Sequence, residues 1–261
     1  MEWVVVAVVV GVVVSMVLSR QQRGRAAQER AAEELDRLRR TVEEDVTRYG
    51  EELGELHVDT LTTELDAAMR QDYQRALDSY ENAKTLLRDA RVPEDVTPVT
   101  RTLEDGRYAL ACVRARAEGQ PLPTRRPPCF FNPAHGPAQT DVAWAPPGGA
   151  PREVPVCLAD ADRLAQGAEP DVRQVRRGNE MVPWFRGGPA YGPYAGGYYG
   201  GYAMSGLFPG ILIGSMLGMP AGDVSGGAGE DWSGDPAADS AGDAGGGDFG
   251  GGDAGCGDFG G

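Results

Sequence analysis

The chain has 261 residues and a formal net charge of -14, with 39 acidic residues against 25 basic ones. This acidity argues against general nucleic-acid binding, which needs a basic surface to displace counterions from phosphates. Most of the 38 glycines lie after residue 191, and a stretch so poor in large side chains cannot build a conventional hydrophobic core.

The first predicted element is a membrane anchor over residues 1–19. Residues 3–18 are hydrophobic apart from one glycine and one serine, and as a helix they cover roughly 24 Å of the ~30 Å hydrocarbon core. Glu2 precedes this run and Arg20 follows it, which is the reverse of the charge order in a cleaved signal peptide. Because the arginine side stays in the cytoplasm, we expect an uncleaved anchor in the lipid of the cell membrane, with the N-terminus outside and the body cytoplasmic.

Residues 20–92 are predicted to be a helical coiled-coil region that continues to about Arg91. Apolar residues recur every three or four positions from Leu35 to Leu56, which places them on one narrow stripe of a helix between charged residues. Such a stripe is typical of a coiled-coil seam, so we expect this region to self-associate or to fold back on itself. Gly50 and Gly54 each cost about 1 kcal/mol relative to alanine inside a helix, and favour a bend or loose pairing there.

Residues 93–120 are predicted to contain the next helix. Val92 and Pro93 end the preceding helical region, and a new apolar stripe runs from Val99 to about Ala117. The short break predicts an antiparallel helical hairpin. The expected fold class is therefore mainly α, with a small α+β module and a glycine-rich C-terminus.

Residues 121–180 are predicted to form that small module. A proline-rich stretch, which must be extended, leads into Cys129 and His135. Apolar residues alternate with polar ones on both sides of residues 146–149, which predicts a β-hairpin. Cys157 closes its second strand and a short helix follows.

The segment that carries Cys129 and His135 is a short turn, or knuckle. The order of knuckle, hairpin and helix resembles small zinc modules of the treble-clef kind. Zinc takes about four donors in a tetrahedron, and Cys129, His135 and Cys157 would supply three. The fourth would be Asp160, placed where such modules usually have a second cysteine, or Cys112 from the preceding helix. The alternatives are a Cys129–Cys157 disulfide in an extracytoplasmic module, Cys112 as a small buried hydrophobe, and a Cys129–His135 nucleophile pair.

Several short segments carry a wider resemblance. They are Pro128-Cys129-Phe130-Phe131, His135-Gly136-Pro137, Val154-Pro155-Val156-Cys157 and Ala159-Asp160-Ala161. With the glycine- and tyrosine-rich stretch that follows, they resemble a family of uncharacterised, membrane-anchored actinobacterial proteins. The resemblance runs from the anchor to about Met219 and implies no activity. The glycine-rich tail alone is similar to the tails of bacterial membrane proteins that bear a TPM domain.

Three segments follow the module. Residues 181–202 are rich in glycine and tyrosine, and we expect either an interfacial aromatic belt or a disordered adhesive segment. Residues 203–219 carry no charge and have glycine at every fourth position from Gly206, which favours a second membrane segment, spanning or re-entrant. Residues 220–261 are expected to be a disordered acidic tail.

The motifs of common enzyme classes are missing from the sequence. It contains no phosphate loop, nucleotide fingerprint, serine elbow or paired-histidine motif, and its 2 histidines leave few options for acid–base chemistry. We therefore expect a non-enzymatic, membrane-anchored scaffold that binds other proteins or itself, without a nucleic-acid or small-molecule partner. The alternative is a metal-dependent enzyme or regulator centred on Cys129, His135 and Cys157.

Overall fold

The computed structural model describes residues 2–146 and 151–205 of the chain, without the side chains of residues 2–14, 17–18 and 203–205. The fold is mainly α, as the periodicity predicts, with two small two-stranded sheets. Most of the second predicted membrane segment, from residue 206, and the whole acidic tail lie outside the described residues.

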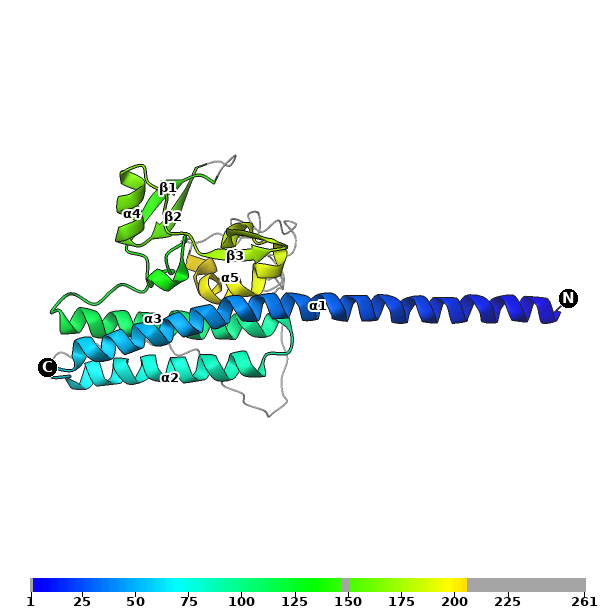
Figure 1. The fold of residues 1–261 in the computed structure, drawn as a ribbon, viewed down its shortest axis with the longest axis horizontal. Coiled ribbons are helices and arrows are strands. Elements are labelled where there is room, and N and C mark those ends of the chain that lie inside the picture. Colours follow the sequence, from blue (N-terminus) through cyan, green and yellow to red (C-terminus); the bar gives the residue numbers. More distant parts are fainter. Residues whose placement is uncertain (1, 147–150, 206–261) are drawn as a thin grey trace, which may run out of the picture.

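Three helices form the body of the molecule (Figure 1). They are α1 (Glu2–Thr60), α2 (Ala67–Asp89) and α3 (Val96–Ala117), with the 3-10 turn η1 (Pro93–Asp95) before α3. The C-terminal half of α1 lies along α2 and α3, whereas its N-terminal half projects from the bundle as a single helix. The predicted hairpin is the α2–α3 pair, and the chain leaves α2 just before Pro93.

The predicted helical region up to about Arg91 consists of two helices, because α1 ends at Thr60 and α2 begins at Ala67. The chain turns over residues 61–66, and Asp66 then caps α2 by accepting a hydrogen bond of 2.7 Å from the backbone N–H of Met69. Neither glycine interrupts α1. Gly50 makes room for the ring of Tyr80, whose nearest atoms would lie 3.0 Å from a Cβ at that position.

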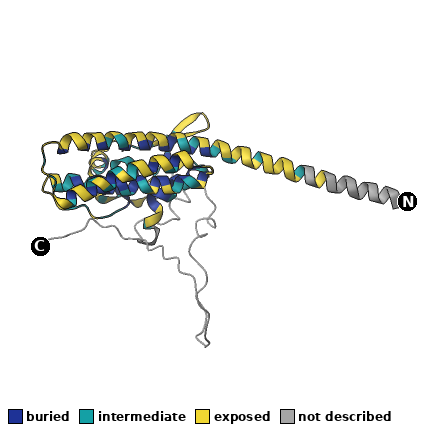
Figure 2. Ribbon diagram, turned by 90° about the horizontal axis from the view of Figure 1, so that it is seen from below, coloured by how far each residue is buried: buried dark blue, intermediate teal, exposed yellow. Residues whose placement is uncertain are grey.

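The predicted seam on α1 is the side of the helix that enters the bundle (Figure 2). Its apolar members are all buried: Leu35, Leu38, Val42, Val46, Tyr49, Leu53 and Leu56. They pack with residues of α2 and α3 such as Ala76, Leu87 and Leu103, so the helical region folds back on itself, one of the two predicted arrangements. Burial of this stripe stabilises the part of α1 that contains Gly50 and Gly54.

The predicted anchor is the first part of α1. Among the residues that the structure describes, no helix is both long enough and apolar enough to cross a bilayer. The side chains of residues 2–14 and 17–18 are outside the described set, so the anchor stays a prediction.

The remaining elements form the small module and a short helix that packs on the body. They are η2 (Pro133–His135), β1 (Thr140–Trp144), β2 (Arg152–Val156), α4 (Leu158–Ala165), β3 (Gln174–Arg177), β4 (Glu180–Pro183), η3 (Trp184–Arg186), η4 (Pro189–Tyr191), α5 (Gly192–Tyr199) and η5 (Gly200–Ser205). Strands β1 and β2 pair antiparallel with Thr140 opposite Val156, and β3 and β4 pair antiparallel with Val175 opposite Val182. Figure 1 shows β1, β2 and α4 above the bundle, with β3 and α5 beside α1.

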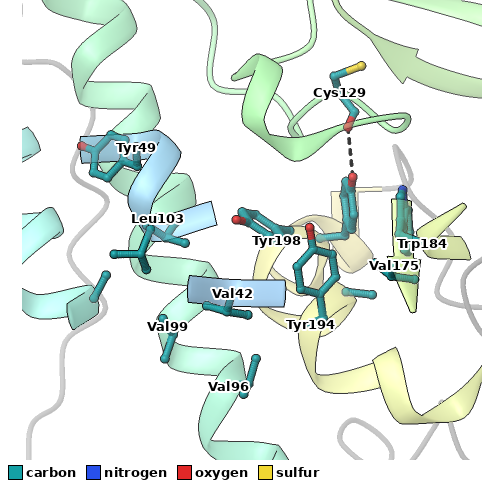
Figure 3. Close-up of a cluster of buried hydrophobic side chains, with 14 of the residues drawn as sticks. Val42, Tyr49, Val96, Val99, Leu103, Cys129, Val175, Trp184, Tyr194 and Tyr198 are labelled. Carbon is teal, nitrogen blue, oxygen red and sulfur yellow. Dashed lines mark hydrogen bonds between the residues drawn. The ribbon is translucent and has the colours of Figure 1, made fainter. Parts of the chain in front are cut away.

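The tyrosines of residues 181–202 overturn the prediction of an aromatic belt or disordered segment. Tyr191, Tyr194, Tyr198 and Tyr199 are almost completely buried, and Figure 3 shows Tyr194 and Tyr198 beside Trp184 in the core. Their hydroxyls are hydrogen bonded: those of Tyr194 and Tyr198 donate to Oδ2 of Asp45 on α1, over 2.9 and 3.2 Å. The small residues between the tyrosines allow α5 to lie directly on α3.

Two glycines give a matched test of this packing. In Gly197→Ala the added Cβ would overlap Oγ1 of Thr100 and the backbone oxygen of Thr97 on α3, so we expect a loss of about 1–3 kcal/mol of unfolding free energy. In Gly54→Ala no described atom lies within 4 Å of the new Cβ, and we expect a gain of about 0.5–1 kcal/mol. Denaturant unfolding of the full chain measures both, and equal effects would contradict the close approach of α5 to α3.

Candidate metal centre

A knuckle of residues 128–137 carries two of the predicted donors. Its ends are joined where the backbone N–H of Cys129 donates to the carbonyl of Gly136 over 3.0 Å. Asn132 caps the turn η2 by accepting from the N–H of Ala134 over 3.1 Å, and Gly136 supplies the positive φ of 76° that ends it. The knuckle therefore turns His135 back over Cys129.

The other two donors begin α4. Cys157 is the N-cap of this helix, and its Sγ accepts from the backbone N–H of Asp160 over 3.4 Å. The N-terminus of a helix favours negative charge, so a thiolate and a carboxylate are both stabilised there. The knuckle is fastened to β2 by a hydrogen bond of 2.8 Å from the N–H of Phe130 to the carbonyl of Pro155, which brings the two pairs of donors together.

The four donor atoms converge on one point. Oδ2 of Asp160 lies 3.2 Å from Sγ of Cys129, 3.5 Å from Sγ of Cys157 and 2.9 Å from Nδ1 of His135. Sγ of Cys157 lies 3.5 Å from the same Nδ1, and all four atoms are within 4.8 Å of one another. Zinc–donor distances of about 2.0–2.3 Å place the corners of a regular tetrahedron roughly 3.3–3.8 Å apart. The observed separations are close to that size, so the cluster can hold a metal ion such as zinc.

Burial makes this cluster unusual for a set of polar groups. The side chain of Asp160 is 0% exposed, Cys129 is fully buried, and the His135 side chain is only 16% exposed. A buried carboxylate is costly unless its oxygens are satisfied. Oδ1 accepts from the backbone N–H of Asp171 over 2.9 Å and lies 3.6 Å from the guanidinium of Arg163, which leaves Oδ2 for the cluster.

The electrostatics favour a cation between the thiols and the imidazole. A hydrogen bond from Cys129, with another from His135, lowers the pKa of Cys157 to about 5 against the effect of burial. The same Cys129–Cys157 bond and burial raise the pKa of Cys129. Burial lowers the pKa of His135, but its contacts with Cys157 and with Asp160 outweigh this and raise it. A divalent metal ion would displace the protons that Cys129 and His135 otherwise hold.

Asp171 is a functional candidate that the sequence did not reveal. Its Oδ2 lies 3.1 Å from Nε2 of His135, on the far side of the ring from the cluster. A carboxylate in this position fixes the ring and leaves Nδ1 free to bind a metal, and such partners are common behind ligating histidines. Asp171 follows α4 at no spacing that a zinc motif specifies, so only the folded chain identifies it.

The structure separates the predicted site residues into two groups. Cys129, His135, Cys157 and Asp160 come together, whereas Cys112 is buried in α3 outside the cluster. Asp160 is therefore the fourth donor of the group. Cys129 and Cys157 are free thiols, which does not fit the alternative of a disulfide between them.

A packed group of aromatic side chains, called here the aromatic base, supports the knuckle. The ring of Phe130 lies 5.3–5.5 Å, between centroids, from four other rings: those of Phe131, Trp144, Trp184 and Phe185. Nε1 of Trp184 donates to the carbonyl of Phe130 over 2.7 Å, and the hydroxyl of Tyr199 donates to the carbonyl of Cys129 over 3.0 Å. Figure 3 shows Cys129 above Trp184, Tyr194 and Tyr198. The donor positions are thus fixed by packing on α5 and not by the small hairpin alone.

Fold and donors together define a helical protein with a small cluster of two cysteines, one histidine and one aspartate that can bind a metal ion. Comparison with known proteins assigns no relative to it, since no family model, no curated protein and no solved structure matches the chain. A functional conclusion therefore depends on the geometry of this cluster and on how it is joined to the helices.

Proposed function

We propose that the protein is a membrane-anchored, non-enzymatic scaffold in which a zinc ion holds the small module in its folded form on a three-helix body. The observation that carries this proposal is the convergence of two thiols, an imidazole and a carboxylate within 4.8 Å in a buried cluster. The module and the helices would then present surfaces to other proteins on the cytoplasmic side of the membrane.

The chemistry of the donors supports zinc over other ions. Thiolates and imidazole suit zinc, whereas calcium and magnesium prefer sites made only of oxygen. Four protein donors would fill a tetrahedral coordination shell, which is typical of structural zinc. A catalytic zinc would instead keep one position open for water or substrate, and Asp160 would occupy that position here.

The connection between module and body supports a scaffold. Arg173, directly before β3, donates its backbone N–H to the carbonyl of Phe131 over 2.9 Å. Its guanidinium reaches α1, where it lies 2.9 Å from a carboxylate oxygen of Asp45 and 2.9 Å from one of Glu44. The module is thereby fixed to the helix that continues toward the predicted anchor.

Metal analysis of the purified full-length protein tests the proposal. We expect about one zinc ion per chain, because one four-donor cluster provides one tetrahedral site. Cys157→Ser should abolish metal binding, and Asp171→Ala, which keeps all four donors, should weaken it by roughly 10–100-fold. Asp162→Asn, at an exposed position of α4 outside the cluster, is the matched control and should retain the metal. Equal metal in the wild type and Cys157→Ser, or none in either, would contradict the proposal.

A second candidate is an enzyme with Cys157 as its nucleophile. One observation favours it: the ring of His135 contacts Sγ of Cys157 through Nδ1, over 3.5 Å, and the carboxylate of Asp171 through Nε2, over 3.1 Å. Such a triad gives no role to the thiol of Cys129. It also gives none to the buried Asp160, which contacts the same ring nitrogen, Nδ1. If this candidate is right, the purified protein should lack metal and iodoacetamide should alkylate Cys157 selectively.

A further inference from the structure

We infer that Cys129 and Cys157 form an oxidation site, at which a peroxide converts the two thiolates into a disulfide and expels the metal ion. This inference deepens the proposed function and depends on it, because it names the regulation of the same cluster. It follows from the make-up of the donor set, the placement of the two sulfurs and their different exposure.

The two sulfur atoms can coordinate the metal ion or form a disulfide with each other, but they cannot do both. On zinc, two thiolates lie roughly 3.8 Å apart, at about 2.3 Å from the ion. In a disulfide the sulfur–sulfur distance is about 2.05 Å, and neither sulfur keeps the charge that binds zinc. The two Sγ atoms lie within 4.8 Å of each other and both are free thiols, so a small movement of the knuckle toward α4 would join them.

Cys157 is placed to react first. It is 8% exposed, whereas Cys129 is fully buried beneath the knuckle, and its position as the N-cap of α4 favours the thiolate. Solvent reaches the neighbouring ring of His135 from a cleft of about 910 Å³ that lies between α1, α3 and the knuckle. A small, neutral oxidant such as hydrogen peroxide can enter this cleft.

The chemistry balances with hydrogen peroxide as the only oxidant. The Cys157 thiolate attacks one peroxide oxygen, the oxygen–oxygen bond breaks, and the departing hydroxide takes a proton to give water. The resulting sulfenic acid is attacked by the Cys129 thiolate, the sulfur–oxygen bond breaks, and a second hydroxide takes a second proton. Two thiolates, one peroxide and two protons thus give one disulfide and two water molecules.

Oxidation removes both thiolates from a four-donor set. His135 and Asp160 remain, and one imidazole with one carboxylate is too few donors for structural zinc. In the cytoplasm, where we expect the body to lie, disulfides are reduced by cellular dithiols and are mostly transient and redox-sensing. The site would therefore reset when a dithiol reductant and zinc are both present.

Zinc release and disulfide formation can be measured on the same full-length protein. The zinc-loaded chain is treated with hydrogen peroxide beside a chromogenic chelator, and its digests are analysed by mass spectrometry. We expect one zinc ion released for each Cys129–Cys157 disulfide, with recovery on addition of a dithiol and zinc. Asp162→Asn, at an exposed position of α4 outside the cluster, should behave like the wild type.

The order of attack has its own control. Brief peroxide treatment of the zinc-loaded wild type in the presence of dimedone should trap the sulfenic acid on Cys157, with no dimedone on Cys129. Metal that stays bound, or metal released with both thiols still reduced, would overturn the inference and leave the metal site standing. A protein without metal before peroxide is added would overturn the proposed function, and this inference with it.

Discussion

Chelating the metal is expected to unfold the module from about residue 128 to residue 165 while α1, α2 and α3 keep their structure. The module has two short strands and one helix of 8 residues, and domains below about 40 residues rarely fold without a metal or disulfide. Structural zinc contributes roughly 10–16 kcal/mol of binding free energy in zinc-finger peptides, so its loss is decisive for a unit of this size.

Hydrogen exchange of the full-length protein, with and without chelator, measures this effect segment by segment. Amides of the knuckle, such as those of Cys129 and Gly136, and those of α4 should lose protection, whereas amides around Leu103 in α3 should not change. Chelator saturated with zinc beforehand is the control. Uniform protection throughout the chain after metal removal would show that the aromatic base alone holds the module.

Replacing Asp45 by alanine is expected to destabilise the body by about 3–5 kcal/mol, because it removes the acceptor of two buried tyrosine hydroxyls and one of the two carboxylates that pair with Arg173. Asp45 is 4% exposed, and its carboxylate accepts from the hydroxyls of Tyr194 and Tyr198 and pairs with Arg173 over 2.9 Å. This single side chain therefore links α1 with α5 and with the chain that leaves the module.

Thermal or denaturant unfolding of the full chain gives the measurement. Asp45→Asn keeps the size and part of the hydrogen bonding, and should fall between the wild type and Asp45→Ala. Glu43→Ala, at an exposed position two residues away, should change the unfolding free energy by less than about 0.5 kcal/mol. A loss for Asp45→Ala no larger than that for Glu43→Ala would mean that the buried network contributes little.

Local patterns were enough to predict the buried stripe of α1 and the residues that meet in the Cys/His/Asp cluster. The stripe from Leu35 to Leu56 follows the helical period, so its burial could be predicted without knowing what covers it. Cys129, His135, Cys157 and Asp160 could be grouped because the order of knuckle, hairpin and helix brings distant donors together in small modules. In both cases the spacing along the chain sets the geometry directly.

What failed depended on contacts between segments far apart in the chain. Tyr194 and Tyr198 are buried because they bind Asp45, which precedes them by about 150 residues in sequence, and no local pattern encodes that pairing. Asp171 reaches His135 because of the path that the chain takes after α4, and that path depends on tertiary packing. The break after Thr60 was missed because the apolar residues follow a helical period both before and after it. The cap residue Asp66 lies in a polar stretch, where an aspartate is not distinctive.

The unbroken course of α1 has a geometric consequence for the whole protein. None of residues 19–34 is buried, yet this stretch joins the predicted anchor to the bundle as one helix, so it acts as a rigid shaft roughly 24 Å long. Each residue of a helix advances about 1.5 Å and turns about 100°. The length of this stretch would thus set the distance of the small module from the bilayer. The number of residues in it would also set the orientation of the module about the helix axis.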